Sequence, residues 1–173
     1  MDQSVKYKIL IVDDDEMILR ALRHALFSIG TEILEARSAE EALDMVADKS
    51  VDLVISDYHF GNAMTGIDLF EKISSQHPEI MNILLTGKPD LNMAMDAINR
   101  AMIYKVMLKP WDNSILCLSV RRALEKVELS RENKRLTSEL KKRDDIIEDL
   151  ESKNPGITDL KRDESGFIVI EDE

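Results

Sequence analysis

The chain has 173 residues, 44% of them hydrophobic and 33% charged, which suits one hydrophobic core with an appendage. Its formal net charge of −11 argues against a surface for nucleic acid or anionic membranes, because phosphate contacts need clustered Lys and Arg. The sequence has no apolar run near the roughly 18 residues of a membrane span, so we expect a cytoplasmic protein with no membrane contact.

Short apolar runs alternate with segments of helical periodicity from residue 7 to residue 125. The expected strands are residues 8–12, 32–36, 51–57, 80–86 and 104–108. The expected helices carry apolar residues within 18–29, 42–46, 67–73, 93–98 and 116–127. Gly30 is expected to end the first helix, and Ser38 with Glu41 to form a capping box at the start of the second. Five βα units in a row predict an α/β fold with a doubly wound, five-stranded parallel sheet covered by helices on both faces.

Beyond the fifth helix the composition changes. Of the 48 residues from 126 to 173, 24 are charged, and such a segment cannot bury enough surface to fold as an independent globule. We therefore expect a domain over residues 1–125 and a helical coiled-coil extension of the fifth helix over residues 126–153. Residues 154–173 are expected to form a small hairpin or a disordered tail.

The extension has no Gly or Pro and fits a heptad pattern. Asn133, Leu140 and Ile147 occupy position a, and Leu129, Leu136 and Leu150 occupy position d, while Arg143 interrupts position d. A single Asn at position a specifies register in parallel dimers, so we expect a homodimer through residues 126–153 and favour a parallel one. The alternative is a single solvated helix held by charge pairs four residues apart.

Polar residues follow the expected strands where each one ends. Asp13 and Asp14 follow the first strand, Asp57 ends the third, Thr86 ends the fourth and Lys109 follows the fifth. The carboxyl ends of parallel strands meet at one edge of the sheet, so these side chains should lie together. Three carboxylates repel one another unless a hard cation neutralises them, and oxygen-only ligation suits Mg²⁺. A lysine and a hydroxyl can bind phosphoryl oxygens, so the set predicts a carboxylate that accepts a phosphoryl group.

Each residue of this set also has an ordinary interpretation. Asp13 alone could cap a helix, and Asp57 alone could simply end a strand. Lys109 alone could be a solvated loop charge. Their convergence on one edge of the sheet favours the functional interpretation.

With these motifs, residues 6–127 resemble the receiver domain of two-component response regulators. The matching segments are ILIVDDDE at 9–16, DLVISD at 52–57, LLTG at 84–87 and KPW at 109–111. The resemblance implies a flavodoxin-like fold in which Asp57 is the phosphoacceptor. It also implies Mg²⁺ held by Asp13, Asp14, Asp57 and the backbone carbonyl of His59, with Thr86 as the switch hydroxyl, Lys109 as the phosphate-binding cation and a cis peptide before Pro110.

The resemblance further implies a function. The domain would accept a phosphoryl group from a histidine kinase or a phosphotransfer protein, and it would be a signalling domain, not an enzyme with a substrate of its own. The phosphoaspartate would shift an equilibrium toward an active face built from the fourth helix, the fifth strand and the fifth helix. A downstream protein target would read that face, together with the coil.

Two departures from the family pattern leave an alternative open. The loop at residues 58–66 has no Pro and one extra residue. Val106 stands where the family has its aromatic switch residue, and Tyr104 lies two positions earlier. The alternative is a degenerate, non-phosphorylated receiver that acts as a dimerisation scaffold.

Overall fold

Five parallel strands form one sheet in this computed structural model, which describes residues 7–60, 64–87 and 103–153. The strands are β1 (Lys8–Val12), β2 (Glu32–Ala36), β3 (Leu53–Asp57), β4 (Met81–Thr86) and β5 (Ile103–Leu108). Their order across the sheet is β2-β1-β3-β4-β5, the flavodoxin-like order, and the predicted fold class is confirmed. The chain passes from β1 to β2 on one side of β1, and it then crosses to β3 on the other side of β1. The topological switch point therefore lies between β1 and β3.

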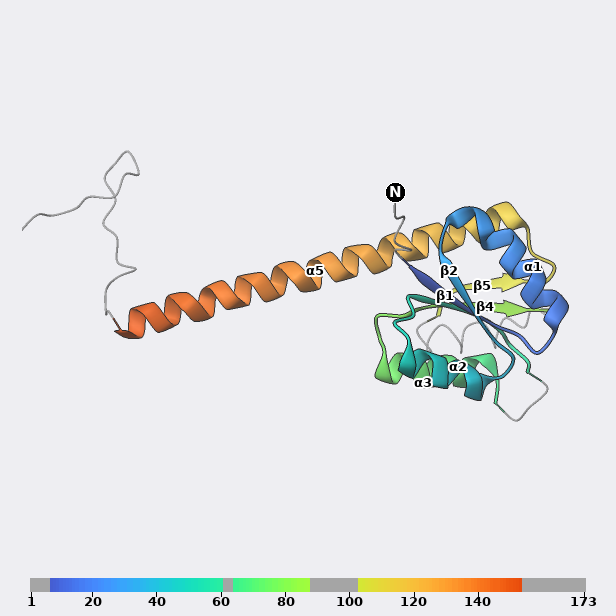
Figure 1. Ribbon diagram of the computed structural model, residues 1–173, viewed down its shortest axis with the longest axis horizontal. Helices are drawn as coiled ribbons and strands as arrows, with labels where there is room; N and C mark the ends of the chain where they lie inside the picture. Colours follow the sequence, from blue (N-terminus) through green and yellow to red (C-terminus); the bar gives the residue numbers. More distant parts are fainter. Residues whose placement is uncertain (1–6, 61–63, 88–102, 154–173) are drawn as a thin grey trace, which may run out of the picture. The chain divides into compact units, whose positions relative to one another are not determined.

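Helices cover both faces of the sheet (Figure 1). They are α1 (Glu16–Leu26), followed by a 3-10 turn at Phe27–Ile29, then α2 (Ala39–Asp48), α3 (Gly66–Gln76) and α5 (Asn113–Lys153). One face packs against α1 and the first part of α5, through Ile9, Ile11 and Ile55 of the sheet. The other face packs against α2 and α3, through Leu10 and Val54. The predicted helix with apolar residues within 93–98 lies outside the described residues.

Some element ends differ from those predicted. The third strand begins at Leu53 instead of Val51, and Asp52, just before it, is bonded to the first residue of β1. The Asp52 backbone N–H donates to the Lys8 carbonyl at 2.9 Å, and the Lys8 N–H donates to the Asp52 carboxylate at 2.7 Å. Gly30 has a φ of 74° and ends the turn after α1, as predicted.

The predicted capping box at α2 forms only in part. The Glu41 N–H donates to the Ser38 hydroxyl at 3.1 Å, but the Glu41 carboxylate accepts from the N–H of Arg37 at 2.7 Å. A complete capping box opens α3 instead, where Thr65 and Asp68 each accept from the other's backbone N–H. This second box holds the helix that begins beside the end of β3.

The chain divides into two units, residues 1–130 and residues 131–173. In the first unit α5 buries the predicted apolar face, Leu116, Val120, Ala123, Leu124 and Val127. In the second unit the described part is helix, residues 131–153, and its side chains are exposed. In the described part of the chain, no helix is both long and apolar enough to cross a membrane. The predicted hairpin or tail over 154–173 lies outside the described residues.

Candidate functional site

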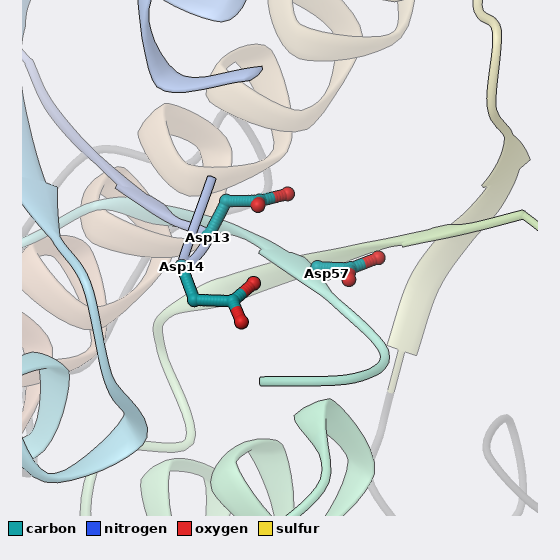
Figure 2. A group of neighbouring side chains, drawn as sticks. All are labelled: Asp13, Asp14 and Asp57. Atoms are coloured by element: carbon teal, nitrogen blue, oxygen red, sulfur yellow. The ribbon is translucent and has the colours of Figure 1, made fainter. Parts of the chain in front are cut away.

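Three carboxylates meet at the carboxyl ends of β1 and β3, at the switch point of the sheet (Figure 2). Asp13 and Asp14 follow β1, and Asp57 is the last residue of β3. One oxygen from each carboxylate lies within 4.8 Å of the others. Asp13 is buried, Asp57 is half-buried and Asp14 is exposed, so the group is open to solvent on one side.

The side chain of Lys109 bridges two of these carboxylates. Its Nζ lies 2.7 Å from Oδ2 of Asp13 and 3.0 Å from Oδ1 of Asp57. The backbone helps to place it, because the Lys109 N–H donates to the carbonyl of Thr86 at 2.8 Å. The peptide bond between Lys109 and Pro110 is cis, as the family resemblance implied.

Burial and hydrogen bonding shift the pKa of Asp13 and the pKa of Lys109 in opposite directions. Burial raises the pKa of Asp13, and the hydrogen bonds from Lys109 and from the N–H of Asp15 only partly offset that rise. Burial alone would lower the pKa of Lys109, but its hydrogen bonds to Asp13 and Asp57 outweigh burial and raise the pKa. Lys109 therefore remains positively charged. Its single positive charge is smaller than the combined charge of the three carboxylates when all are ionised.

The donor set fits a hard divalent cation. Carboxylate oxygens are the ligands that Mg²⁺ prefers, and the exposed side at Asp14 leaves room for the waters that this ion retains. Burial raises the pKa of Asp13, and a bound cation would oppose that rise by favouring the ionised carboxylate.

The chain just after Asp57 is held closely in place. The Tyr58 N–H donates to the carbonyl of Leu85 at 2.9 Å, and the Gly66 N–H donates to the carbonyl of Tyr58 at 2.8 Å. A Cβ at Gly66 would lie 2.2 Å from the carbonyl oxygen of Asp57, so only glycine fits there. Sequence reasoning missed Gly66 and the Thr65–Asp68 box. The available signal was a Thr-Gly-x-Asp segment, a cap followed three residues later by an acid.

Two other predicted site residues lie near the same edge. Thr86 is buried at the end of β4, next to Leu85, which pairs with Asp57. His59 is exposed, and its backbone bridges that of Thr65 in antiparallel fashion. Its ring stands edge-on to the ring of Tyr58, with 4.4 Å between the centroids.

Tyr104 and Val106 lie on opposite sides of β5. Val106 packs against the cluster under α2 and α3, while Tyr104 packs against the cluster under α1 and α5. The ring of Tyr104 has Nζ of Lys126 at 5.5 Å from its centroid, within cation–π range. Tyr104 therefore contacts the fifth helix.

The fold and the acidic group define a doubly wound α/β domain with three carboxylates gathered at its switch point. The family model of the response regulator receiver domain matches residues 9–121, well over half of the chain. The chain belongs to this family.

Curated relatives are bacterial regulators. The chain is 35% identical over 133 residues to the C4-dicarboxylate transport transcriptional regulatory protein DctD of Rhizobium meliloti, covering 77% of this chain and 28% of that protein. It is 31% identical over 131 residues to the nitrogen assimilation regulatory protein NtrX of Azorhizobium caulinodans, covering 75% of this chain and 29% of that protein. The chain thus spans less than a third of the length of these relatives.

Solved structures share the fold. The signal receiver domain of an HD domain-containing protein from Pseudomonas fluorescens is 42% identical, with a TM-score of 0.67, and the match covers 70% of this chain and 97% of that one. A CheY-like response regulator receiver domain protein from Methanospirillum hungatei is 27% identical, also with a TM-score of 0.67, covering 72% of this chain and 98% of that one.

Proposed function

We propose that the chain is a phosphorylation-controlled switch in which Asp57 accepts a phosphoryl group from a histidine kinase or a phosphotransfer protein. The observation that carries the proposal is the position of Lys109, whose Nζ contacts Asp57 at 3.0 Å inside a group of three carboxylates. A lysine held against a half-buried carboxylate marks where the new phosphoryl oxygens would be bound.

The chain's own groups have distinct roles in the transfer. An oxygen of Asp57 attacks phosphorus, the bond to the donor nitrogen breaks, and a phosphorus–oxygen bond forms. Lys109 and the hydroxyl of Thr86 then bind oxygens of the new phosphoryl group. Asp13, Asp14, Asp57 and the backbone carbonyl of His59 would hold Mg²⁺, which when bound neutralises charge on the transferring oxygens. The domain acts on its own carboxylate, as a signalling domain without a small-molecule substrate.

The signal passes from the site to α5 through β5, which carries Lys109 at its end. Two contacts join β5 to α5: Lys105 Nζ donates to the Ser119 hydroxyl at 2.7 Å, and Tyr104 contacts Lys126. Movement of Lys109 toward a phosphoryl group would therefore shift β5 and, through these contacts, the first part of α5. The readout is the face around β5 and α5 and a homodimeric coil through residues 126–153, recognised by a downstream protein in the cytoplasm. The net charge of −11 favours a protein target over direct contact with nucleic acid.

The alternative, a degenerate receiver that serves only as a scaffold, has no support in the site. The acceptor, the acidic pair and the lysine are all present and lie together. The altered loop does not remove any of these groups.

Intact-mass measurement after incubation with phosphoramidate and Mg²⁺ tests the proposal. We expect the parent chain to gain one phosphoryl group and Asp57→Asn to gain none. Asp15→Asn is the matched control, because Asp15 caps α1 through the N–H of Met17 and lies outside the carboxylate group. A folded parent that gains no phosphoryl group, or an Asp57→Asn variant that gains one, would refute the assignment.

A further inference from the structure

The extension carries a row of apolar side chains that the described part of the chain leaves uncovered. Leu129, Leu136, Leu140, Ile147 and Leu150 are between 41% and 66% exposed on α5. Their spacing follows positions a and d of a heptad. A second helix that covers these side chains would remove their apolar surface from water. The dimer proposed above supplies that helix, and the inference below rests on that dimer.

Counting apolar layers decides the orientation of the pair. A parallel, in-register pair sets each of the five apolar residues against its own copy and Asn133 against Asn133. The antiparallel alignment that sets Leu129 against Ile147 and Leu136 against Leu140 gives four apolar layers, and it leaves Leu150 opposite Lys126. Because apolar contact area dominates such pairs, the parallel arrangement is favoured.

Register follows from the polar layers. A slip of one heptad, in either direction, would set Asn133 of one chain against Leu140 of the other and Arg143 against Leu150. Each slip buries a polar group against an apolar one without a partner, which costs free energy. In the in-register pair, Asn133 instead faces its own copy, whose amide oxygen can accept a hydrogen bond, and Arg143 has Asp144 of the second copy beside it.

Arg143 occupies a core position in this arrangement. A side chain at position d enters a hole that includes positions d and e of the facing helix, and these are Arg143 and Asp144 of the second copy. The two arginines repel each other, while each has a carboxylate of the other chain beside it. In the single chain both Arg143 and Asp144 are exposed.

The charge of the helix changes sign at this same point. Residues 131–143 contain six bases and two acids, for a net charge of +4. Residues 144–153 contain one base and five acids, for a net charge of −4. A parallel pair therefore brings like charges together along both halves, and the junction between Arg143 and Asp144 is where opposite charges from the two chains meet.

We propose that Arg143 of each chain pairs with Asp144 of a second copy, and that this symmetric pair of ion pairs fixes the register of a parallel dimer while keeping the dimer weak. The geometry places a charged residue in a layer where leucine would bind more tightly, so the dimer is held in one register at the expense of affinity. The partner proposed for this row of apolar side chains is therefore a second copy of this chain.

Sedimentation of the full chain at several concentrations tests the strength of the dimer. We expect Arg143→Leu to lower the dissociation constant by about tenfold or more, because an apolar layer replaces two like charges. We expect Asp144→Asn to raise it by about threefold or more, because Arg143 loses its partner. The matched control is Asp145→Asn, which removes the same charge at an outer heptad position and should leave the constant unchanged.

A charge exchange separates pairing from simple charge effects. Arg143→Glu alone should weaken the dimer, and adding Asp144→Arg to it should restore the constant toward that of the parent. An unchanged constant in Arg143→Leu would overturn the proposal, as would equal effects of Asp144→Asn and Asp145→Asn.

Cross-linking tests the orientation. In a Cys117→Ser background, Leu136→Cys should form a disulfide between two chains on mild oxidation, because residue 136 faces its own copy only in the parallel pair. Lys142→Cys, at an outer position, is the control and should not. Failure of Leu136→Cys to cross-link would overturn the parallel register. That result would leave the proposed phosphorylation of Asp57 open, because phosphorylation is tested separately by intact-mass measurement.

Discussion

Lys109 and Asp13 show how one buried contact sets the chemistry of the site. The lysine remains charged because two carboxylates hold it, but its single charge does not compensate the three acids around it. Burial raises the pKa of Asp13. Since its folded pKa lies above the ordinary value of 3.8, the stability contributed by Asp13 is present at low pH and is lost as pH rises from 3.8 through the folded pKa. At neutral pH the ionised carboxylate of Asp13 therefore carries a cost in folding free energy, which the contacts of Lys109 partly offset.

Asp13→Asn should remove that cost and weaken the cation site. We expect a higher urea midpoint than the parent in the absence of Mg²⁺, together with a Mg²⁺ affinity lower by about tenfold or more. Urea unfolding with and without Mg²⁺ measures both effects. Asp15→Asn is the control, because Asn caps helices about as well as Asp, and it should change neither quantity. A parent without added stability in Mg²⁺ would contradict the prediction.

Gly66→Ala should destabilise the domain by roughly 2–4 kcal/mol, because the new Cβ would press on the backbone beside the acceptor. That Cβ would lie 2.2 Å from the carbonyl oxygen of Asp57, and backbone on both sides must move to relieve the contact. Gly87→Ala is the matched control, since a Cβ there meets nothing within 4 Å. Urea denaturation of both variants measures the difference, and equal stabilities would be inconsistent with the geometry.

At the scale of elements, all five strands were predicted with their last residues, and only the starts of β3, β4 and β5 differ, by one or two residues. Apolar runs such as Lys8–Val12 are buried on both faces, so composition alone marks them. The start of β3 was misplaced because the residue at which a strand begins depends on its pairing with neighbouring strands, which the pattern of residue types does not contain.

Some residues of the candidate site could be predicted from the sequence, and others could not. Asp13, Asp57 and Lys109 could be predicted because strand ends in a parallel sheet share one edge. Gly66 could not, because its requirement comes from a close approach to Asp57 that only the folded loop creates. The partner chosen by Glu41, the N–H of Arg37 instead of that of Ser38, likewise depends on local backbone geometry that a pattern of residue types does not contain.

The two helix caps give a prediction at this scale. Thr65→Ala removes the cap of α3, and Ser38→Ala removes the cap of α2, so each should cost about 1 kcal/mol of unfolding free energy. Only Thr65→Ala should also slow phosphorylation, because α3 begins at Gly66, against the carbonyl of Asp57. Urea unfolding and the rate of mass gain with phosphoramidate measure the two effects. Equal phosphorylation rates in both variants would show that the cap supports only the helix.

At the scale of the whole molecule, α5 extends from the first unit into the second. Its first part is buried against the sheet, and its exposed part carries the heptad row. Because β5 is followed by Lys109 and contacts α5 through Lys105 and Tyr104, the proposed switch at Asp57 is linked to the first part of α5 by these side-chain contacts. Coupling of this kind is a free energy shared by both sites, and it must act in both directions.

Phosphorylation should therefore change the affinity of the dimer, by roughly fivefold or more in either direction. Sedimentation of the full chain with Mg²⁺, before and after reaction with phosphoramidate, measures the dissociation constant. Asp57→Asn should show no change on the same treatment, and Leu136→Asp should stay monomeric in both states because a charge replaces an apolar layer. By reciprocity, conditions that favour the dimer must bias the phosphorylated state by the same factor. If the parent and Asp57→Asn respond alike, the receiver and the coil act independently, and the readout would then lie in the β5 and α5 face alone.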